Sequence, residues 1–175
     1  MKPHPAIQLR DYIRDIPNFP KPGITFRDIS PLLANGEAFS ACISELAVNM
    51  PRDVEAIVGI ESRGFLFGAA LAQLTGVGFV PIRKSGKLPL ETHAIEYELE
   101  YGTDILEIHK DALGHGHKVV VIDDLLATGG TAAATVQLCQ KLGANVAACL
   151  FVIELEDLKG RDKLTGVPTF SLMKY

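Results

Sequence analysis

The segment from Val119 to Thr131 constrains the fold of this 175-residue chain more than any other. Four consecutive β-branched residues, Val119 to Ile122, predict a strand that is buried on both faces, as strands are in the centre of a parallel sheet. An apolar repeat that starts at Ala132 predicts the next helix, and Gly143 is placed to end it. We therefore expect an α/β fold with a mainly parallel central sheet flanked by helices.

Polar and small residues join this strand to its helix. Asp123 and Asp124 come where the strand would reach the sheet edge, and the turn that follows contains Ala127, Thr128, Gly129, Gly130 and Thr131. Amide hydrogens and the helix dipole favour an anion at such a turn, whereas two adjacent carboxylates need solvent, a cation or hydroxyl donors. The pattern predicts a site for a phosphorylated sugar. A tight turn without a ligand is the alternative, and the pattern matches neither a Walker loop nor a dinucleotide fingerprint.

A second polar turn follows the strand predicted at Ala56 to Ile60. It reads Glu61-Ser62-Arg63-Gly64 and precedes a helix predicted from Phe65 to Leu74. Loops at the carboxyl ends of parallel strands converge on the ligand in open α/β sheets. Arginine at a helix start is unfavourable for the dipole unless an anion neutralises it, which favours a phosphate partner. An ordinary surface arginine is the alternative.

The densest basic cluster follows the strand predicted at Gly78 to Ile82. Arg83, Lys84 and Lys87 fall within five residues of an otherwise acidic chain. Such clusters are often solvated loops, but the position at a strand end favours a loop that closes over a diphosphate.

The segment from Leu90 to Ile108 changes to period-two alternation. Apolar residues from Ile95 to Tyr101 alternate with glutamates from Glu96 to Glu100 around a glycine-containing turn, which predicts a half-exposed β-hairpin. We expect this hairpin to cover the site and exclude water from it. A solvated acidic strand, in which Glu100 differs in nothing from its neighbours, is the alternative.

The N-terminal part contains a different kind of segment. The spacing of apolar residues predicts a short helix from Ile7 to Ile16, and a second helix is predicted from Glu37 to Asn49. Between them, residues 19–31 combine prolines, a glycine and two phenylalanines. Such a rigid apolar loop either connects the two helices or binds a flat heterocycle through side-chain contacts and main-chain hydrogen bonds.

Composition limits the remaining choices. The formal net charge of −4 and the absence of a Lys/Arg run argue against a nucleic-acid surface. No apolar run is long enough for a membrane span, and the first residues lack the apolar region of a signal peptide. Three cysteines without metal spacing indicate a reducing, cytoplasmic location. We expect one domain over residues 1–175. Its C-terminal part is predicted as a strand at 146–153, a loop with one short helix at 154–164 and an edge strand at 167–173.

The segment from Val119 to Thr131 resembles the phosphoribosyl-diphosphate (PRPP) motif of the type I phosphoribosyltransferases. The resemblance implies that Asp123 and Asp124 hold the ribose hydroxyls and that the following turn holds the 5′-phosphate. It further implies a β-hairpin hood, a magnesium ion held mainly by PRPP rather than by a dedicated protein cage, and a homodimer. The residues it assigns to the diphosphate are Glu61, Ser62, Arg63, Arg83, Lys84 and Lys87, of which Arg63 also counts as catalytic.

Other segments resemble the adenine-specific members of that family. By position, Thr25, Phe26 and Arg27 would line the adenine site, although some relatives carry an aliphatic residue in place of Thr25. Glu100 and Tyr101 match a Glu-Tyr pair at the hood, with Glu100 as the catalytic carboxylate. Ala127 stands where enzymes for 6-oxopurines usually have an aspartate. The resemblance thus implies transfer of phosphoribose from PRPP to adenine. A xanthine enzyme and a non-catalytic PRPP sensor are the alternatives.

Overall fold

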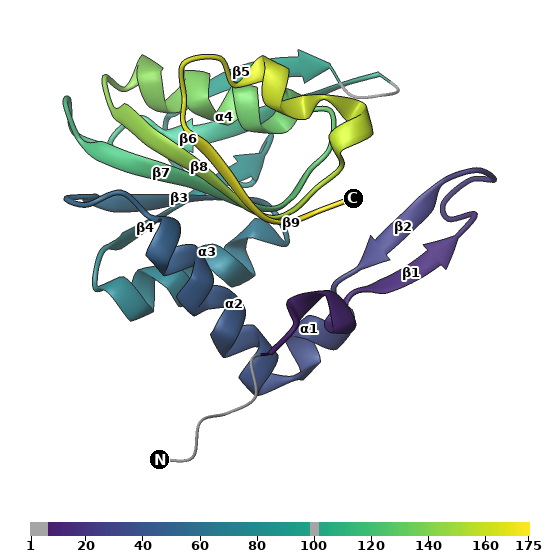
Figure 1. Cartoon of the computed structure of the whole chain (residues 1–175). Coiled ribbons are helices and arrows are strands. Elements are labelled where there is room, and N and C mark those ends of the chain that lie inside the picture. The colour runs from purple at the N-terminus through teal and green to yellow at the C-terminus, as the bar shows by residue number, and fades with distance from the viewer. Residues whose placement is uncertain (1–6, 99–101) are drawn as a thin grey trace, which may run out of the picture. The chain divides into compact units, whose positions relative to one another are not determined.

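A computed structural model describes residues 7–98 and 102–175 (Figure 1). Its packing divides the chain into two compact units, residues 1–45 and residues 46–175, which we describe separately. The expectation of a single domain stays a prediction. Helix α2 (Gly36–Asn49) crosses the boundary between the units in sequence and confirms the second predicted helix.

The larger unit is built on a seven-stranded sheet in the order β5-β6-β4-β3-β7-β8-β9. The strands from β4 to β9 in that order are parallel, whereas β5 and β6 form an antiparallel hairpin joined to β4. The expected mainly parallel sheet is therefore confirmed. The strand bounds are β3 (Ala56–Ile60), β4 (Gly78–Lys84), β5 (Thr92–Glu98), β6 (Thr103–His109), β7 (Lys118–Leu126), β8 (Asn145–Glu154) and β9 (Thr169–Lys174).

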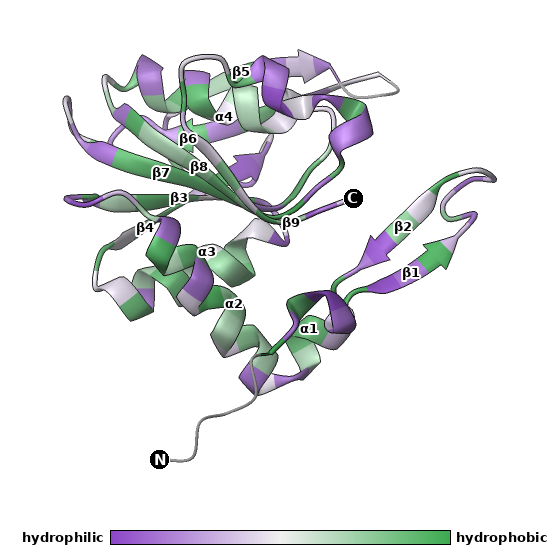
Figure 2. Cartoon of the chain, in the orientation of Figure 1, coloured by the Kyte–Doolittle hydropathy of each residue, from purple (hydrophilic) through white to green (hydrophobic). Residues whose placement is uncertain are grey.

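Helices α3 (Gly64–Thr75) and α4 (Gly130–Lys141) cover opposite faces of this sheet (Figure 1). Alternate residues of β7 face them: Val121 belongs to the core cluster that includes residues of α4, whereas Ile122 lies against α3 at Gly68. The central strands are accordingly hydrophobic along most of their length (Figure 2). Burial on both faces explains the uninterrupted β-branched run.

The ring of Phe79 on β4 fills a slot between β3 and α3. A Cβ atom on Gly59 would lie 2.4 Å from Phe79 Cε2, and one on Gly68 would lie 2.6 Å from the same atom. Phe65 meets the ring of Phe79 edge-on, with ring centroids 5.6 Å apart. The two glycines therefore make room for an aromatic side chain, which brings α3 close to the sheet.

The N-terminal unit contains a hairpin where we predicted a helix. The predicted helix from Ile7 to Ile16 is wrong, because only η1 (Leu9–Tyr12) is helical, as a 3-10 turn, and β1 (Arg14–Pro17) pairs with β2 (Thr25–Asp28). The spacing of apolar residues is compatible with one face of a helix. It contains no information on the ion pair between Arg14 and Asp28, which links the two strands of the hairpin. A short helix, α1 (Ser30–Ala34), follows β2.

Three further boundaries differ from the expectations. The acidic pair lies inside β7, since pairing with β8 continues to Leu126. Strand β4 includes Arg83 and Lys84, which pair with β6. Two 3-10 turns, η2 (Glu156–Leu158) and η3 (Gly160–Lys163), replace the single short helix. Within the described ranges, no helix is long and apolar enough to cross a membrane.

Candidate functional site

The turn after β7 encloses a pocket of about 70 Å³. This volume exceeds what a single water needs. Gly129 has a φ of +78° and directly precedes α4, so the backbone turns sharply at the helix start. The lining residues are Asp123, Leu125, Leu126, Ala127, Thr128, Gly129, Thr131 and Ala132. The structure thus brings together most of the residues predicted for ribose and phosphate, whereas Asp124 and Gly130 do not line this pocket.

The two carboxylates next to this pocket are poorly compensated within the chain. Burial raises the pKa of Asp123 well above its usual value, and the neighbouring Asp124 charge raises it further. Burial also raises the pKa of Asp124, although Arg63 partly offsets this. The Asp124 amide donates to Asp123 Oδ1 at 2.9 Å. A buried acidic pair of this kind favours protons, cations or hydroxyl donors supplied from outside.

Helix α3 begins directly against the acidic pair. A Cβ atom on Gly64 would lie 2.9 Å from Asp123 Oδ1, so only glycine lets the helix start approach this closely. Arg63, immediately before the helix, lies with its Nε 2.9 Å from Asp124 Oδ2. The anion that we inferred beside Arg63 is therefore supplied by the chain itself. The position of this arginine at the helix start does not by itself indicate a phosphate, and the assignment of half-exposed Arg63 to the diphosphate stays a prediction.

The basic cluster is also paired with acids. Arg83 donates to both carboxylate oxygens of Glu61, at 3.1 and 3.3 Å, and the Lys84 amide donates to Glu61 at 3.0 Å. The hydrogen bond from Arg83 holds the pKa of Glu61 below its usual value. Lys87 is exposed on the turn after β4. These contacts join the ends of β3 and β4, where the Glu61–Ser62 peptide bond is cis.

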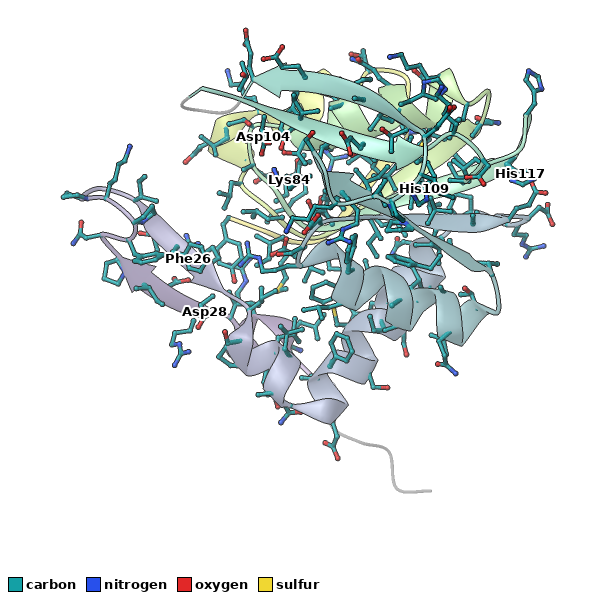
Figure 3. All side chains as sticks on the ribbon, turned by 180° about the vertical axis from the view of Figure 1, so that it is seen from behind. Phe26, Asp28, Lys84, Asp104, His109 and His117 are labelled. Carbon is teal, nitrogen blue, oxygen red and sulfur yellow. The ribbon has the colours of Figure 1, made fainter. Side chains whose placement is uncertain are left out.

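Lys84 connects β4 to the hairpin (Figure 3). Its Nζ forms an ion pair with Asp104 on β6 and donates to the Tyr97 hydroxyl on β5 at 2.8 Å. Burial lowers the pKa of Lys84, but the hydrogen bonds with Asp104 and Tyr97 outweigh burial and raise it overall. Tyr97 is buried whereas Glu96 and Glu98 are exposed, so the predicted alternating hairpin is confirmed. Glu100 and Tyr101 lie outside the described residues.

The predicted base-binding residues lie on β2 of the N-terminal unit. Arg27 forms an ion pair with Asp15, and Phe26 meets Phe19 edge-on with ring centroids 5.3 Å apart. Thr25 is exposed at the start of the strand. Residues 25–28 therefore form a hairpin strand, held by the ion pair and the aromatic contact, rather than an irregular loop.

Asp28 ends this strand and holds it in place. It accepts hydrogen bonds from Arg14 on β1 and from the Ser30 hydroxyl and amide, and these bonds lower its pKa from 3.8 to about 2. Figure 3 shows Phe26 and Asp28 on the same strand.

His117 and His109 have separate surroundings in the larger unit. His117 Nδ1 accepts the Gly114 amide at 3.1 Å at the start of β7, and His109 is half-buried on β6 (Figure 3). Across residues 7–98 and 102–175, no group of three or more His, Cys, Asp or Glu side chains is placed to hold a metal ion.

Sequence reasoning missed a backbone contact behind the pocket. A Cβ atom on Gly129 would lie 2.2 Å from the carbonyl oxygen of Gly160 in η3. Gly160 is distant in sequence and sits in a charged segment, so nothing in the local pattern links it to the turn.

Comparison with known proteins places this geometry in a family. Residues 28–167 match the family described as phosphoribosyl transferase domain. The chain is 58% identical over 168 residues to an adenine phosphoribosyltransferase of a Roseiflexus species, covering 95% of this chain and 98% of that one.

Solved structures agree. The crystal structure of adenine phosphoribosyltransferase from Thermoanaerobacter pseudethanolicus matches with a TM-score of 0.92 and 54% identity, over 95% of this chain and 98% of that one. The Saccharomyces cerevisiae enzyme matches with a TM-score of 0.89 and 46% identity, over 94% and 96%. That structure is a complex with adenine and D-2,5-dideoxy-2,5-imino-altritol 1,6-bisphosphate. The sheet, the turn after β7 and these matches together show that the chain belongs to the adenine phosphoribosyltransferases, a branch of the type I phosphoribosyltransferase family.

Proposed function

We propose that this chain transfers the 5-phosphoribosyl group of PRPP to adenine, giving AMP and diphosphate. The observation that carries the proposal is the pocket at the turn after β7, which Thr128, Gly129 and Thr131 line together with the buried carboxylate Asp123. Hydroxyls of a ribose would add donors to Asp123 and Asp124, whose pKa values stay raised despite the contacts with the Asp124 amide and Arg63. The yeast relative's complex with adenine and an imino-sugar bisphosphate supports the same ligand classes.

The residues around this pocket suit a displacement at the anomeric carbon. As the bond to diphosphate breaks, positive charge develops on the ribose and negative charge on the leaving group. Arg63, Arg83, Lys84 and Lys87 would stabilise the diphosphate as it departs, which requires exchange of some of their present carboxylate partners. The hairpin β5–β6 would exclude water from the cationic state.

A magnesium ion fits this proposal. Mg²⁺ takes oxygen ligands and is usually bound through one or two carboxylates together with substrate phosphates. Asp123 and Asp124 are carboxylates of that kind, and the ion would be held mainly by PRPP. It would screen the charge of the diphosphate. Removing divalent cations with a chelator should abolish turnover, and added Mg²⁺ should restore it.

Ala127 supports adenine as the base. A 6-oxopurine enzyme usually has an aspartate at this position, and here the residue that lines the pocket has no acid. The test is a spectrophotometric screen of adenine, hypoxanthine, guanine and xanthine with PRPP and Mg²⁺. We expect turnover with adenine alone at a substantial rate, and equal or faster turnover of another purine would disprove the adenine assignment.

Glu100 is proposed as the carboxylate that handles the purine proton. The purine must lose or relocate a proton when it is glycosylated, and positioned general acids or bases contribute about 10²- to 10⁴-fold in rate. Glu100→Gln should therefore lower kcat by about 100-fold or more while PRPP affinity stays largely intact. Steady-state kinetics and PRPP binding would measure this, with Glu98→Gln as the matched control on the same hairpin. An unchanged kcat would remove Glu100 from the mechanism.

Two coarser properties are also proposed. A homodimer follows from the resemblance and would appear as twice the chain mass in light scattering. A cytoplasmic location is supported by the three buried cysteines, which form no disulfide. Burial raises the pKa of Cys42, Cys139 and Cys149 to about 12, so all three are unreactive thiols that suit a reducing compartment.

A further inference from the structure

The 3-10 turn η3 packs against the backbone of the turn after β7, which is the proposed phosphate site. Gly160 and Gly129 meet backbone to backbone: a Cβ atom on Gly160 would lie 2.1 Å from the Ala127 carbonyl oxygen and 2.9 Å from the Gly129 nitrogen. Neither position can accept a side chain without displacement of the other segment. The direction of the amides in the turn after β7 is therefore coupled to the position of η3.

An ion pair between the half-exposed Arg161 and the buried Glu154 holds η3 in place. Arg161 Nε and Nη2 donate to Glu154 Oε1 and Oε2 at 3.0 and 2.5 Å, and its Nη1 donates to the Thr169 carbonyl oxygen at 2.5 Å. The Ser171 hydroxyl donates to the same Glu154 carboxylate at 2.6 Å. Residue 161 is thereby attached to both β8 and β9, next to the glycine that contacts the turn.

The charges in this cluster are matched within the chain. Glu154 is only 4% exposed, and a buried carboxylate is stable only with an excellent partner. The hydrogen bond from Arg161 lowers the pKa of Glu154, so the pair stays ionised. The guanidinium donates to Glu154 and to the Thr169 carbonyl oxygen, and Arg161 is not among the residues that line the pocket at the turn after β7. Its effect on the pocket must act through Gly160.

We propose that Arg161 and Glu154 are positioning residues for the 5′-phosphate of PRPP: they hold Gly160 against Gly129 and so set the geometry of the turn that binds the phosphate. This inference rests on the proposed function for the identity of the phosphate. It predicts an effect confined to ligands that carry a 5′-phosphate, because Gly160 contacts Ala127 and Gly129 in the turn after β7, whereas the residues proposed for the diphosphate lie at the ends of β3 and β4.

The test compares two parts of the substrate. Ribose 5-phosphate and Mg-diphosphate are titrated calorimetrically into wild type, Gly160→Ala and Arg161→Met. We expect both variants to bind ribose 5-phosphate about tenfold more weakly, or worse, because a small misplacement of binding groups has effects of this size. Diphosphate affinity should stay within about twofold, and in turnover KM for PRPP should rise more than kcat falls. Gly36→Ala is the matched glycine control, since its Cβ would meet nothing within 4 Å.

A general loss of structure would look different. Equal weakening of ribose 5-phosphate and diphosphate, or no weakening of either, would overturn the positioning role. If Gly160→Ala and Arg161→Met fail to fold, Ser171→Ala removes the hydrogen bond to Glu154 and the long one from Arg161 but keeps the ion pair, and should still weaken ribose 5-phosphate binding selectively, by about threefold. Equal changes in the affinities of Ser171→Ala for ribose 5-phosphate and diphosphate would again overturn the positioning role.

Failure of the proposed function is separately visible. Wild type that binds ribose 5-phosphate with the predicted variant pattern, but does not consume adenine and PRPP, would disprove the proposed reaction and leave the positioning role intact. Wild type that does not bind ribose 5-phosphate at all would overturn the positioning role.

Discussion

The acids at the end of β7 and those beside β4 differ in burial, in their ion-pair partners and in the direction of their pKa shifts. Asp123 and Asp124 are adjacent and buried, they share one half-exposed arginine, and burial raises both pKa values. Glu61 and Asp104 each have a cation of their own, and hydrogen bonds from those cations lower both pKa values. Acids of the second kind support the fold by themselves. Acids of the first kind destabilise the free protein when they are ionised, in keeping with the proposal that a ligand completes them.

The largest expected effect concerns ligand binding at β7. Asp123→Asn combined with Asp124→Asn should weaken PRPP binding by about 100-fold, because each lost charged acceptor contributes about 1.5 kcal/mol and 1.4 kcal/mol is a factor of ten. Isothermal titration of PRPP measures this. Unchanged affinity would show that the acidic pair does not hold the ribose.

A smaller effect with the opposite sign concerns stability. In ligand-free protein, Asp123→Asn should raise the free energy of unfolding at pH 8 by about 1 kcal/mol, the size of a typical single substitution. The folded pKa is raised above 3.8, so the ionised carboxylate destabilises the fold at high pH and not below pH 3.8. The gain should therefore shrink as pH falls towards 4 in urea denaturation. A gain that does not depend on pH would contradict this origin.

The smallest effect is expected beside β4. Asp104→Asn should lower the free energy of unfolding at pH 7 by about 0.5–1 kcal/mol, since the pair with Lys84 is partly exposed. The folded pKa of Asp104 lies below 3.8, so this stabilisation exists above pH 3.8 and is lost as pH falls below it. Its pH dependence is thus opposite to that of Asp123.

Two further measurements test the interpretation of Asp104→Asn: its affinity for PRPP and the stability of a control variant. PRPP affinity of Asp104→Asn should not fall, because Lys84 is released towards the diphosphate. Lys110→Ala, which breaks an exposed ion pair with Glu91, serves as the control and should change stability by less than about 0.5 kcal/mol. A larger loss in the control than in Asp104→Asn would remove the distinction between the two kinds of acid.

Local patterns predicted the elements whose burial follows a regular period along the chain. The β-branched run of β7, helix α3 and the alternating hairpin β5–β6 are confirmed, because burial on two faces, on one stripe or on one side leaves a distinct period in the sequence. The family and the type I fold are confirmed as well. The residues from Asp123 to Thr131 were predicted as one site for the same local reason.

Partnerships between distant residues were beyond these patterns. Strand β1 was predicted as part of a helix because its apolar spacing is compatible with a helix. In the structure, ion pairs link β1 to β2 across the hairpin. Arg63 and Arg83 were predicted to bind phosphate. Their ion-pair partners in the structure, Asp124 and Glu61, are distant in sequence and cannot be identified from the sequence pattern. Gly160 was not considered at all, since only the folded chain brings it to Gly129.

The slot around Phe79 has an implication for how such sequences can diverge. Gly59 and Gly68 leave space for one ring, so alanine at either position collides with it, whereas a small residue at 79 would leave an unfilled hole. Substitutions at these three sites should therefore be tolerated only in combination. Among homologues, a branch that loses the aromatic ring is expected to gain bulk at 59 or 68, and that correlated exchange would be visible in an alignment without any measurement on the protein.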